Sequence, residues 1–370
     1  MNVSIIILGG AALGGGGAQK RFFGLWINLR RRGVNCRLIS YESTIKALLM
    51  TDEYSDVDNY ADSIYVLPDM NSVYLKSVNT IEEFLTSIGV TQDEVLHFVM
   101  GYPLFHSLSN KIVFSDPYSK LDHLNIKSKV VWLLSFIQSD IIDILDPLRK
   151  QFWSKVFWYN PKKVSLTSNT FVDIFKYNSL PVAEKKNWLV YLGRFAEVKQ
   201  IEEFVRTIPN INQGLKEVGV LDAVFFILGF GNLENKIREI IQGSEYKDIN
   251  IRMYYEEEPY KILAQAKVFF SLQKYNNYPS KSLAEALSCQ CIPIVTDNGT
   301  TRMIAKPEFS YYVPEKFSKT ELKNKVKEVF SLSDEQLQVK TTAARNFVRD
   351  ELSLDKMTDY YIGLYKQLDH

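Results

Sequence analysis

The feature that most constrains the fold lies near the amino terminus, where a glycine-rich segment separates an apolar run from an amphipathic one. Val3 to Leu8 is a short run rich in β-branched residues, which is typical of a buried strand. Gly9 to Gly17 follow, then residues 18–32 place apolar side chains at helical spacing, and a second apolar run covers 34–40. A strand, a glycine loop, a helix and another strand in this order predict the opening of a doubly wound sheet.

The alternation of strand-like and helical segments continues through the chain. A polar, proline-containing stretch at 178–187 interrupts it and has the composition of a linker. Strands are predicted at residues 64–67, 95–100, 111–114, 130–134 and 164–167 before this stretch, and at 188–192, 224–228, 250–253, 268–272 and 292–296 after it. Strands separated by helices predict parallel sheets covered on both faces.

This organisation predicts an α/β protein with two Rossmann-like, doubly wound domains that face each other across a cleft. Residues 1–183 are assigned to the N-terminal domain and residues 184–350 to the C-terminal domain. Residues 351–370 form a tyrosine-rich helix that we expect to cross back to the first domain. Ligands of such sheets bind at the carboxyl ends of the strands, so candidate functional residues are sought there.

Charge and cysteine content exclude several classes of function. The 44 Lys and Arg residues against 43 Asp and Glu residues give a formal charge of +1. A protein that binds nucleic acid by neutralising phosphates usually has a clear basic excess, so no nucleic-acid partner is expected. Cys36, Cys289 and Cys291 are too few for a disulfide framework, which favours a reducing, cytoplasmic location.

A peripheral contact with the inner face of a membrane is a further option. Six basic residues occur from Lys20 to Arg37 with no acid between them, and basic and aromatic residues interleave at 148–163. Such a composition suits a membrane interface. For 148–163, an ordinary helix with a buried aromatic face is the better explanation.

The sequence predicts no metal site. Its four histidines lack His-x-x-x-His spacing, and Cys289-x-Cys291 has no second pair. Asp56-Val57-Asp58 resembles an acidic metal–nucleotide motif, but it lies in a polar run without a preceding strand. A solvated loop explains that segment better.

Two segments after predicted strands carry groups suited to a phosphate. Arg194 and Lys199 follow the strand at 188–192, and an Arg fork with a Lys charge suits a pyrophosphate. Ordinary solvated charges are the alternative. The second segment, 276–287, begins a helix near Ser280, where exposed N–H groups can hold a phosphate. Glu285 either accepts hydrogen bonds from ribose hydroxyls or closes a capping box with Ser282.

Taken in order, these segments resemble the retaining glycosyltransferases of family 4, which have the GT-B fold. The similarity runs from the glycine loop to about residue 304 and is strongest in the second half. It is carried by VYLGRFAEVKQIEEFV, by FFILGFGNLENKI with its Gly-x-Gly, and by NNYPSKSLAEALSCQCIPIVTDNGTTRMI. In the first half it is carried mainly by GGGGAQKRFFGLWINLRRRG.

The resemblance implies a role for each matching residue. Arg194 and Lys199 are catalytic: they bind the donor diphosphate and stabilise the charge on the leaving group, in place of a metal ion. Glu285 binds the ribose and Tyr254 borders the base. The other donor-binding residues implied are Gly16, Gly17, Gly229, Gly231, Asn277, Tyr278, Pro279, Ser280, Lys281 and Ser282.

The sequence departs from the family pattern at several positions. Asn277 and Asn276 stand where a first Glu is usual, so an amide is expected to contact the sugar hydroxyls. Ser115 and Asp116 stand where many members have a histidine, which makes Asp116, and His97 on a neighbouring strand, candidate catalytic residues. Gln290 replaces a usual Gly and Arg302 a common Glu.

The expected function is that of a retaining glycosyltransferase in polysaccharide, O-antigen or glycolipid synthesis. It moves a sugar from a nucleoside-diphosphate sugar, UDP or GDP, to a saccharide or lipid-linked acceptor and needs no cofactor. The alternatives are a sugar-nucleotide epimerase of related architecture and a catalytically silent subunit of a glycan-assembly complex.

Overall fold

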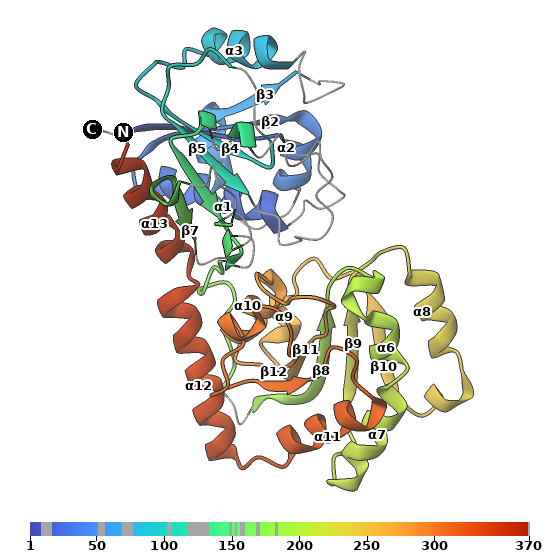
Figure 1. The fold of residues 1–370 in the computed structure, drawn as a ribbon. Coiled ribbons are helices and arrows are strands. Elements are labelled where there is room, and N and C mark those ends of the chain that lie inside the picture. Colours follow the sequence, from blue (N-terminus) through green and yellow to red (C-terminus); the bar gives the residue numbers. More distant parts are fainter. Residues whose placement is uncertain are drawn as a thin grey trace. The chain divides into compact units, whose positions relative to one another are not determined.

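The computed structural model of the chain consists of two compact units. Unit 1 comprises Met1–Asn169 and Leu354–His370, and unit 2 comprises Thr170–Ser353. Figure 1 shows a sheet with helices in each unit. The residues described are 1–8, 17–50, 56–68, 77–101, 106–116, 130, 133–135, 137–147, 150–151, 154–155, 160–167, 171–181 and 184–368.

Unit 1 contains a seven-stranded parallel sheet with the order β3-β2-β1-β4-β5-β6-β7. Its strands are β1 (Asn2–Ile7), β2 (Asn35–Tyr41), β3 (Ile64–Leu67), β4 (Val95–Val99), β5 (Ile112–Asp116), β6 (Ile141–Ile144) and β7 (Val164–Leu166). Its helices include α1 (Gly17–Arg31), α2 (Glu42–Leu49), α3 (Ser77–Ser87) and α13 (Leu354–Lys366). Residues Val3 to Ile7 are all buried, as expected for a parallel strand covered on both faces.

Unit 2 contains a six-stranded parallel sheet with the order β10-β9-β8-β11-β12-β13. Its strands are β8 (Lys186–Leu192), β9 (Val224–Leu228), β10 (Asn250–Tyr254), β11 (Ala266–Ser271), β12 (Ile292–Thr296) and β13 (Tyr311–Val313). Its helices are α6 (Ile201–Val205), α7 (Ile208–Glu217), α8 (Glu234–Ile241), α9 (Tyr260–Leu263), α10 (Lys281–Ser288), α11 (Lys319–Phe330) and α12 (Asp334–Glu351). The two parallel sheets confirm the predicted α/β class.

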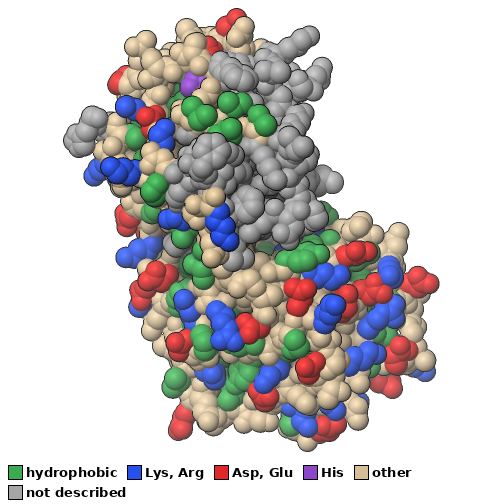
Figure 2. All heavy atoms as spheres, viewed as in Figure 1, with side chains coloured by type: hydrophobic (Ala, Val, Ile, Leu, Met, Phe, Trp, Pro, Cys, Tyr) green, Lys and Arg blue, Asp and Glu red, His purple; other side chains and the backbone are tan. Residues whose placement is uncertain are grey.

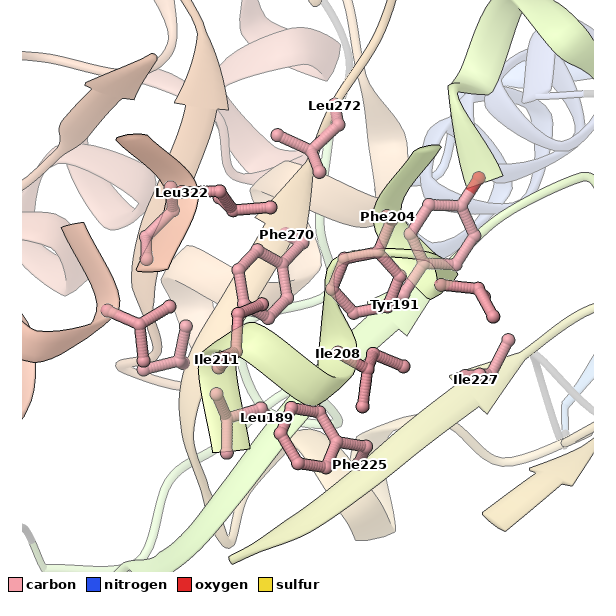
Figure 3. Close-up of a cluster of buried hydrophobic side chains, with 14 of the residues drawn as sticks. Leu189, Tyr191, Phe204, Ile208, Ile211, Phe225, Ile227, Phe270, Leu272 and Leu322 are labelled. Carbon is pink, nitrogen blue, oxygen red and sulfur yellow. The ribbon is translucent and has the colours of Figure 1, made fainter. Parts of the chain in front are cut away.

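The two faces of the second sheet bury separate cores, while acidic and basic side chains are interspersed over the surface of this unit (Figure 2). On one face, strand residues Leu189, Phe225 and Phe270 pack against α6, α7 and α11 (Figure 3). On the other face, the next residues along, such as Val190 and Phe226, pack against α9, α10 and α12. Adjacent residues of the central strands therefore serve opposite cores, which is why a strand such as β9 is apolar throughout.

The predicted strand at 130–134 is wrong. Residues 130 and 133–135 are helical, and the strand beside β5 is β6, at Ile141–Ile144. A short apolar run does not distinguish a strand from a buried helix by its periodicity. The sequence at 141–144 includes an aspartate, which made this strand inconspicuous.

The division between the units lies earlier in the chain than residue 183. Val172 forms a parallel bridge with Ser353, and its N–H donates to the carbonyl of Leu352 at 2.8 Å. Arg345 donates to the carbonyls of Ile174 and Tyr177, at 3.1 and 3.0 Å. These bonds attach the segment that precedes the expected linker to α12, and so to unit 2.

The C-terminal helix α13 belongs to unit 1 and packs against α1. Asn28 of α1 donates from Nδ2 to Thr358 Oγ1 at 2.9 Å and to Asp355 Oδ1 at 3.2 Å. Tyr361 and Tyr365 of α13 are fully buried. Buried aromatic side chains and a buried amide therefore fix the end of the chain to the first sheet.

Replacing Asn28 should weaken the attachment of α13. Asn28→Ala removes the amide that faces Thr358 and Asp355, so we expect a loss of about 1–2 kcal/mol in unfolding free energy, measured by urea denaturation. Asn35→Ala removes an exposed amide that contacts Asn2, and should change stability by less than about 0.5 kcal/mol. Equal stability of the two variants would contradict the assigned role of Asn28.

Candidate functional site

The strand order of unit 2 places a topological switch point between β8 and β11. From β8 the chain proceeds to β9 and β10 on one side, and then returns to β11 and β12 on the other. The loops that leave the carboxyl ends of β8 and β11 therefore diverge. In open α/β sheets, this is the place where ligands bind.

Two cationic residues lie on the loop that follows β8. Lys199 Nζ donates to Gln273 Oε1 at 2.6 Å, which ties this loop to the loop after β11. Burial, and then the nearby charge of Arg194, lower the pKa of Lys199 to about 8. Arg194 is exposed, and neither cation forms an ion pair with a residue that the structure describes. An anion between them would relieve their mutual repulsion.

The loop after β9 lies directly against the loop after β8. Gly193 N–H donates to the carbonyl of Leu228 at 3.0 Å, and Phe195 N–H donates to that of Phe230 at 2.8 Å. A Cβ on Gly229 would lie 2.0 Å from the Gly193 oxygen, and one on Gly231 would lie 2.5 Å from the Phe195 oxygen. The two glycines are therefore required by the packing of these loops on each other.

Gly193 is different from these two glycines. A Cβ there would meet only the Tyr191 ring, at 3.8 Å, which is an ordinary contact. Among the described residues, nothing sterically requires a glycine at this position. A backbone without a side chain, next to Arg194, allows a ligand to approach closely.

The sequence led us to expect that the side chain of Asn277 faces outward, but in the structure it is turned inward. Its side chain is 1% exposed. Its Oδ1 accepts from Ser271 Oγ at 2.8 Å, and its Nδ2 donates to the carbonyl of Thr296 at 2.9 Å and to Thr301 Oγ1 at 3.1 Å. The amide joins β11, β12 and the turn at Thr301, so its proposed contact with sugar hydroxyls does not fit the structure.

The neighbours of Asn277 are also used internally. Asn276 Oδ1 accepts from the N–H groups of Tyr278 and Thr300, at 3.0 and 3.1 Å. The ring of Tyr278 is buried in the core beneath α10, and Pro279 follows it. The backbone groups of this segment, rather than its side chains, therefore remain as candidate contacts for a ligand.

The start of α10 differs from the predicted capping box. Ser280, not Ser282, is the N-cap, and its Oγ accepts from Leu283 N–H at 3.4 Å. Glu285 lies one turn further along, is 6% exposed, and has Oε1 3.7 Å from Lys281 Nζ. The capping explanation for Glu285 is therefore wrong.

Aromatic side chains border the edge of the sheet beyond β9 and β10. Tyr254 ends β10 and is half-buried, and its carbonyl accepts from Gly229 N–H at 3.1 Å. Phe230 and Tyr255 are 37% and 52% exposed, and their rings meet edge to face with centroids 5.4 Å apart. The sequence analysis missed this pair, although aromatic residues directly after two strands could have indicated it.

His97 is a structural residue rather than a catalytic one. It is fully buried, its Nε2 lies 2.7 Å from Ser115 Oγ, and its Nδ1 lies 2.6 Å from the Tyr365 hydroxyl. Because Ser115 donates to Asp143, Nε2 carries the proton and Nδ1 accepts. Burial, with the charge of Arg21, lowers the pKa of His97 to about 3. Both ring nitrogens are used within unit 1.

The remaining candidates of unit 1 lie at the carboxyl edge of its sheet. Asp116 ends β5 and is buried. Gly17 is the first residue of α1, and a Cβ there would meet no atom within 4 Å. Gly16 lies outside the described residues.

Three of the six basic residues between Lys20 and Arg37 form ion pairs with acids that the structure describes. Arg31 pairs with Asp56, Arg32 with Asp355 and Asp359, and Arg37 with Glu94. These residues therefore present little net positive charge to a membrane. In the described part of the chain, no helix has the length and apolarity needed to cross one.

The acidic motif at 56–58 does not form a metal site. Asp56 accepts from Arg31, with Oδ2 2.7 Å from Nε. Across the residues that the structure describes, no group of three or more His, Cys, Asp and Glu side chains is arranged to hold a metal ion.

Comparison with known protein families finds a match within unit 2. Residues 174–346 match the family described as glycosyl transferases group 1. The sequence matches none of the curated proteins.

Comparison with solved structures shows the fold. A glycosyltransferase from Rickettsia africae superposes with a TM-score of 0.77 at 15% identity, covering 99% of this chain and 98% of that one. The Anabaena protein HepE in complex with UDP gives 0.75 at 10% identity, with 99% and 100% covered. A pneumococcal O-GlcNAc transferase in complex with UDP and GlcNAc gives 0.71 at 10% identity, with 100% and 99% covered. The chain therefore has the GT-B fold.

The glycines of the two loops should respond differently to alanine. Gly229→Ala places a methyl group against the Gly193 oxygen, so we expect a loss of about 2–4 kcal/mol in unfolding free energy. Gly193→Ala should stay within about 0.5 kcal/mol of the wild type. Urea denaturation of both variants measures this, and a Gly229→Ala variant as stable as wild type would contradict the loop packing.

The buried His97 should make stability depend on pH. Its pKa is about 3 in the folded chain and about 6.5 when unfolded, so the unfolded state binds the extra proton between these values. Stability should therefore fall as pH drops below about 6.5, by up to about 1.4 kcal/mol per pH unit from this residue.

Urea denaturation of wild type and His97→Gln between pH 7 and pH 4.5 tests this. The variant should be less stable at pH 7, but its stability should fall less steeply toward acid. His106→Gln is the control, since His106 is only half-buried. Parallel pH curves for wild type and His97→Gln would show that His97 binds its proton equally well in the folded and unfolded chain, which contradicts a lowered pKa.

Proposed function

We propose that this chain, whose residues 174–346 match the glycosyl transferases group 1 family, is a retaining, metal-independent enzyme that uses a UDP-sugar. The observation that carries the proposal is a pair of cations at the switch point between β8 and β11, Arg194 and Lys199, for which no described residue supplies an acidic partner. A nucleoside diphosphate supplies the anion that this pair lacks. The likeness in fold to HepE, solved with UDP, supports UDP as the nucleotide.

Arg194 and Lys199 have complementary tasks at the diphosphate. Arg194 is exposed and provides a planar fork for phosphate oxygens. Lys199, with a pKa of about 8, is largely protonated at pH 7, and the bond to Gln273 fixes its ammonium group. Because both charges are in place before the reaction, they stabilise the leaving group without reorganisation.

The rest of the donor is assigned to neighbouring edges of unit 2. Glu285, held near Lys281, accepts from the ribose hydroxyls. The exposed rings of Phe230 and Tyr255, beside Tyr254, border the base. The backbone from Tyr278 to Ser280 contacts the distal phosphate and the sugar, while Asn277 only holds that segment in place.

The reaction proceeds on one face of the sugar. The bond between C1 and the phosphate oxygen breaks, and its electron pair leaves with the nucleoside diphosphate. The acceptor hydroxyl oxygen forms the new bond to C1 from the same face, and its proton passes to the departing phosphate oxygen. Arg194 and Lys199 stabilise the negative charge that develops on the leaving diphosphate in the transition state. This route needs no protein nucleophile.

We assign acceptor binding to unit 1. The product belongs to cell-envelope glycan synthesis on the cytoplasmic side of the membrane. A saccharide or lipid-linked saccharide offers the hydroxyl that the reaction requires. The family resemblance of the glycine segment and α1 supports the placement in unit 1.

Removing either cation should weaken donor binding without unfolding the chain. For Arg194→Ala and Lys199→Met we expect UDP affinity, measured by calorimetry, to fall about 10- to 100-fold, because a charged hydrogen bond is lost. Arg349→Ala removes an exposed guanidinium on α12 that pairs with Asp350, and should bind UDP like wild type. All three variants should melt within a few degrees of wild type.

Two results would oppose the proposal. Unchanged UDP affinity in Arg194→Ala would remove Arg194 from the donor site. A wild-type chain that binds neither UDP nor GDP would favour the catalytically silent subunit.

A further inference from the structure

Arg21 is a buried arginine with unused hydrogen-bond donors. It lies in the second turn of α1 and is 4% exposed. Its Nη2 donates to Thr167 Oγ1 at 3.0 Å and to the Tyr361 hydroxyl at 3.1 Å. Its Nε and Nη1 are buried and have no acceptor within the described part of the chain. Three N–H groups of the guanidinium are therefore unsatisfied.

No carboxylate neutralises Arg21 directly. Among the described residues it forms no ion pair, and Asp143, the acid in its hydrogen-bond network, is reached through Tyr361. The Asp143 carboxylate accepts from the hydroxyls of Tyr361 and Ser115 at 2.7 Å each, and from that of Tyr360 at 3.0 Å. Asp143 thus has its own donors and does not contact the guanidinium.

Burying the Arg21 guanidinium with unsatisfied donors costs free energy when no ligand is bound. A buried, unsatisfied charged donor loses its hydration without compensation. The rings of Phe22 and Tyr361, 5.5 and 5.8 Å from the guanidinium carbon, offset part of this. By contrast, Arg31, the last residue of α1, and Arg32, which directly follows it, are paired with acids.

The position of Arg21 is one where α/β sheets bind ligands. Thr167 directly follows β7, and its N–H donates to the carbonyl of Ile144, the last residue of β6. Arg21 therefore meets the carboxyl edge of the first sheet. It also lies near the amino terminus of α1, whose dipole favours an anion.

We propose that Arg21, with Thr167, binds an oxyanion in unit 1: a phosphate or a carboxylate group. Nε and Nη1 donate to the oxyanion, while Nη2 stays on Thr167 and Tyr361. The source of the group rests on the proposed function: it belongs to the acceptor, which is then an anionic saccharide or a lipid-linked phosphate. This oxyanion is a different group from the donor diphosphate, which binds Arg194 and Lys199 in unit 2.

The test is calorimetry and thermal unfolding in an Arg194→Ala background, which weakens anion binding at the donor site. The probes are inorganic phosphate, glucose 1-phosphate and glucuronate, with glucose as the neutral control. We expect at least one anion to bind and to raise the melting temperature. Adding Arg21→Met should weaken that binding about 10- to 100-fold, because charged hydrogen bonds are removed. Adding Arg32→Met, directly after the same helix, should not.

Each outcome decides the matter. Binding of the anion with equal affinity after Arg21→Met, or binding of no anion in the Arg194→Ala chain, overturns the proposal. Preference for glucuronate points to a carboxylate on the saccharide, and preference for the phosphates points to a phosphorylated acceptor. If Arg21→Met does not fold, Arg21→Lys keeps the charge but removes Nε, and should still weaken anion binding about tenfold.

UDP binding separates this proposal from the donor site. With Arg194 intact, Arg21→Met should bind UDP like wild type. If wild type fails to bind UDP while anion binding still depends on Arg21, the proposed function fails and the Arg21 site stands.

Discussion

The close approach of two backbone segments, 193–195 and 228–233, is the constraint on which the candidate site depends. Backbone hydrogen bonds join these loops, and Gly229 and Gly231 leave the space for them. The contact sets the course of the chain just after β8 and hence the position of Arg194. The bond from Lys199 to Gln273 then fixes the second cation from the other side of the switch point. Among the described residues neither cation has an acidic partner, and this is the basis for proposing an anionic ligand.

Unit 1 is organised around a different kind of interaction. Hydroxyl groups from α13 and the sheet surround the Asp143 carboxylate, and the chain of hydrogen bonds continues through Ser115 to His97 and Tyr365. A buried polar network of this kind is stable only when each member is satisfied. Arg21 is the member whose donors are incompletely used, which distinguishes a binding role from a purely structural one.

The sequence predicted the parallel α/β architecture because the central strands are buried on both faces and therefore apolar throughout. It failed where this rule weakens: the apolar run at 130–134 is helical, and β13 and α12 were not anticipated. The order of predicted strands and helices was enough to place Arg194 and Lys199 after a strand and Glu285 within the helix that begins near Ser280. Side-chain direction could not be predicted. Asn277, in the loop after β11, and His97, in the middle of β4, both turn their polar side chains inward, where partners far along the chain satisfy them.

The most direct test of this account is a crystal structure of the chain with UDP. The account predicts the diphosphate within hydrogen-bond distance of both the Arg194 guanidinium and Lys199 Nζ, with the ribose at Glu285 and the base beside Tyr254. A diphosphate bound elsewhere, or held by a metal ion on carboxylates instead of by these two cations, would contradict it.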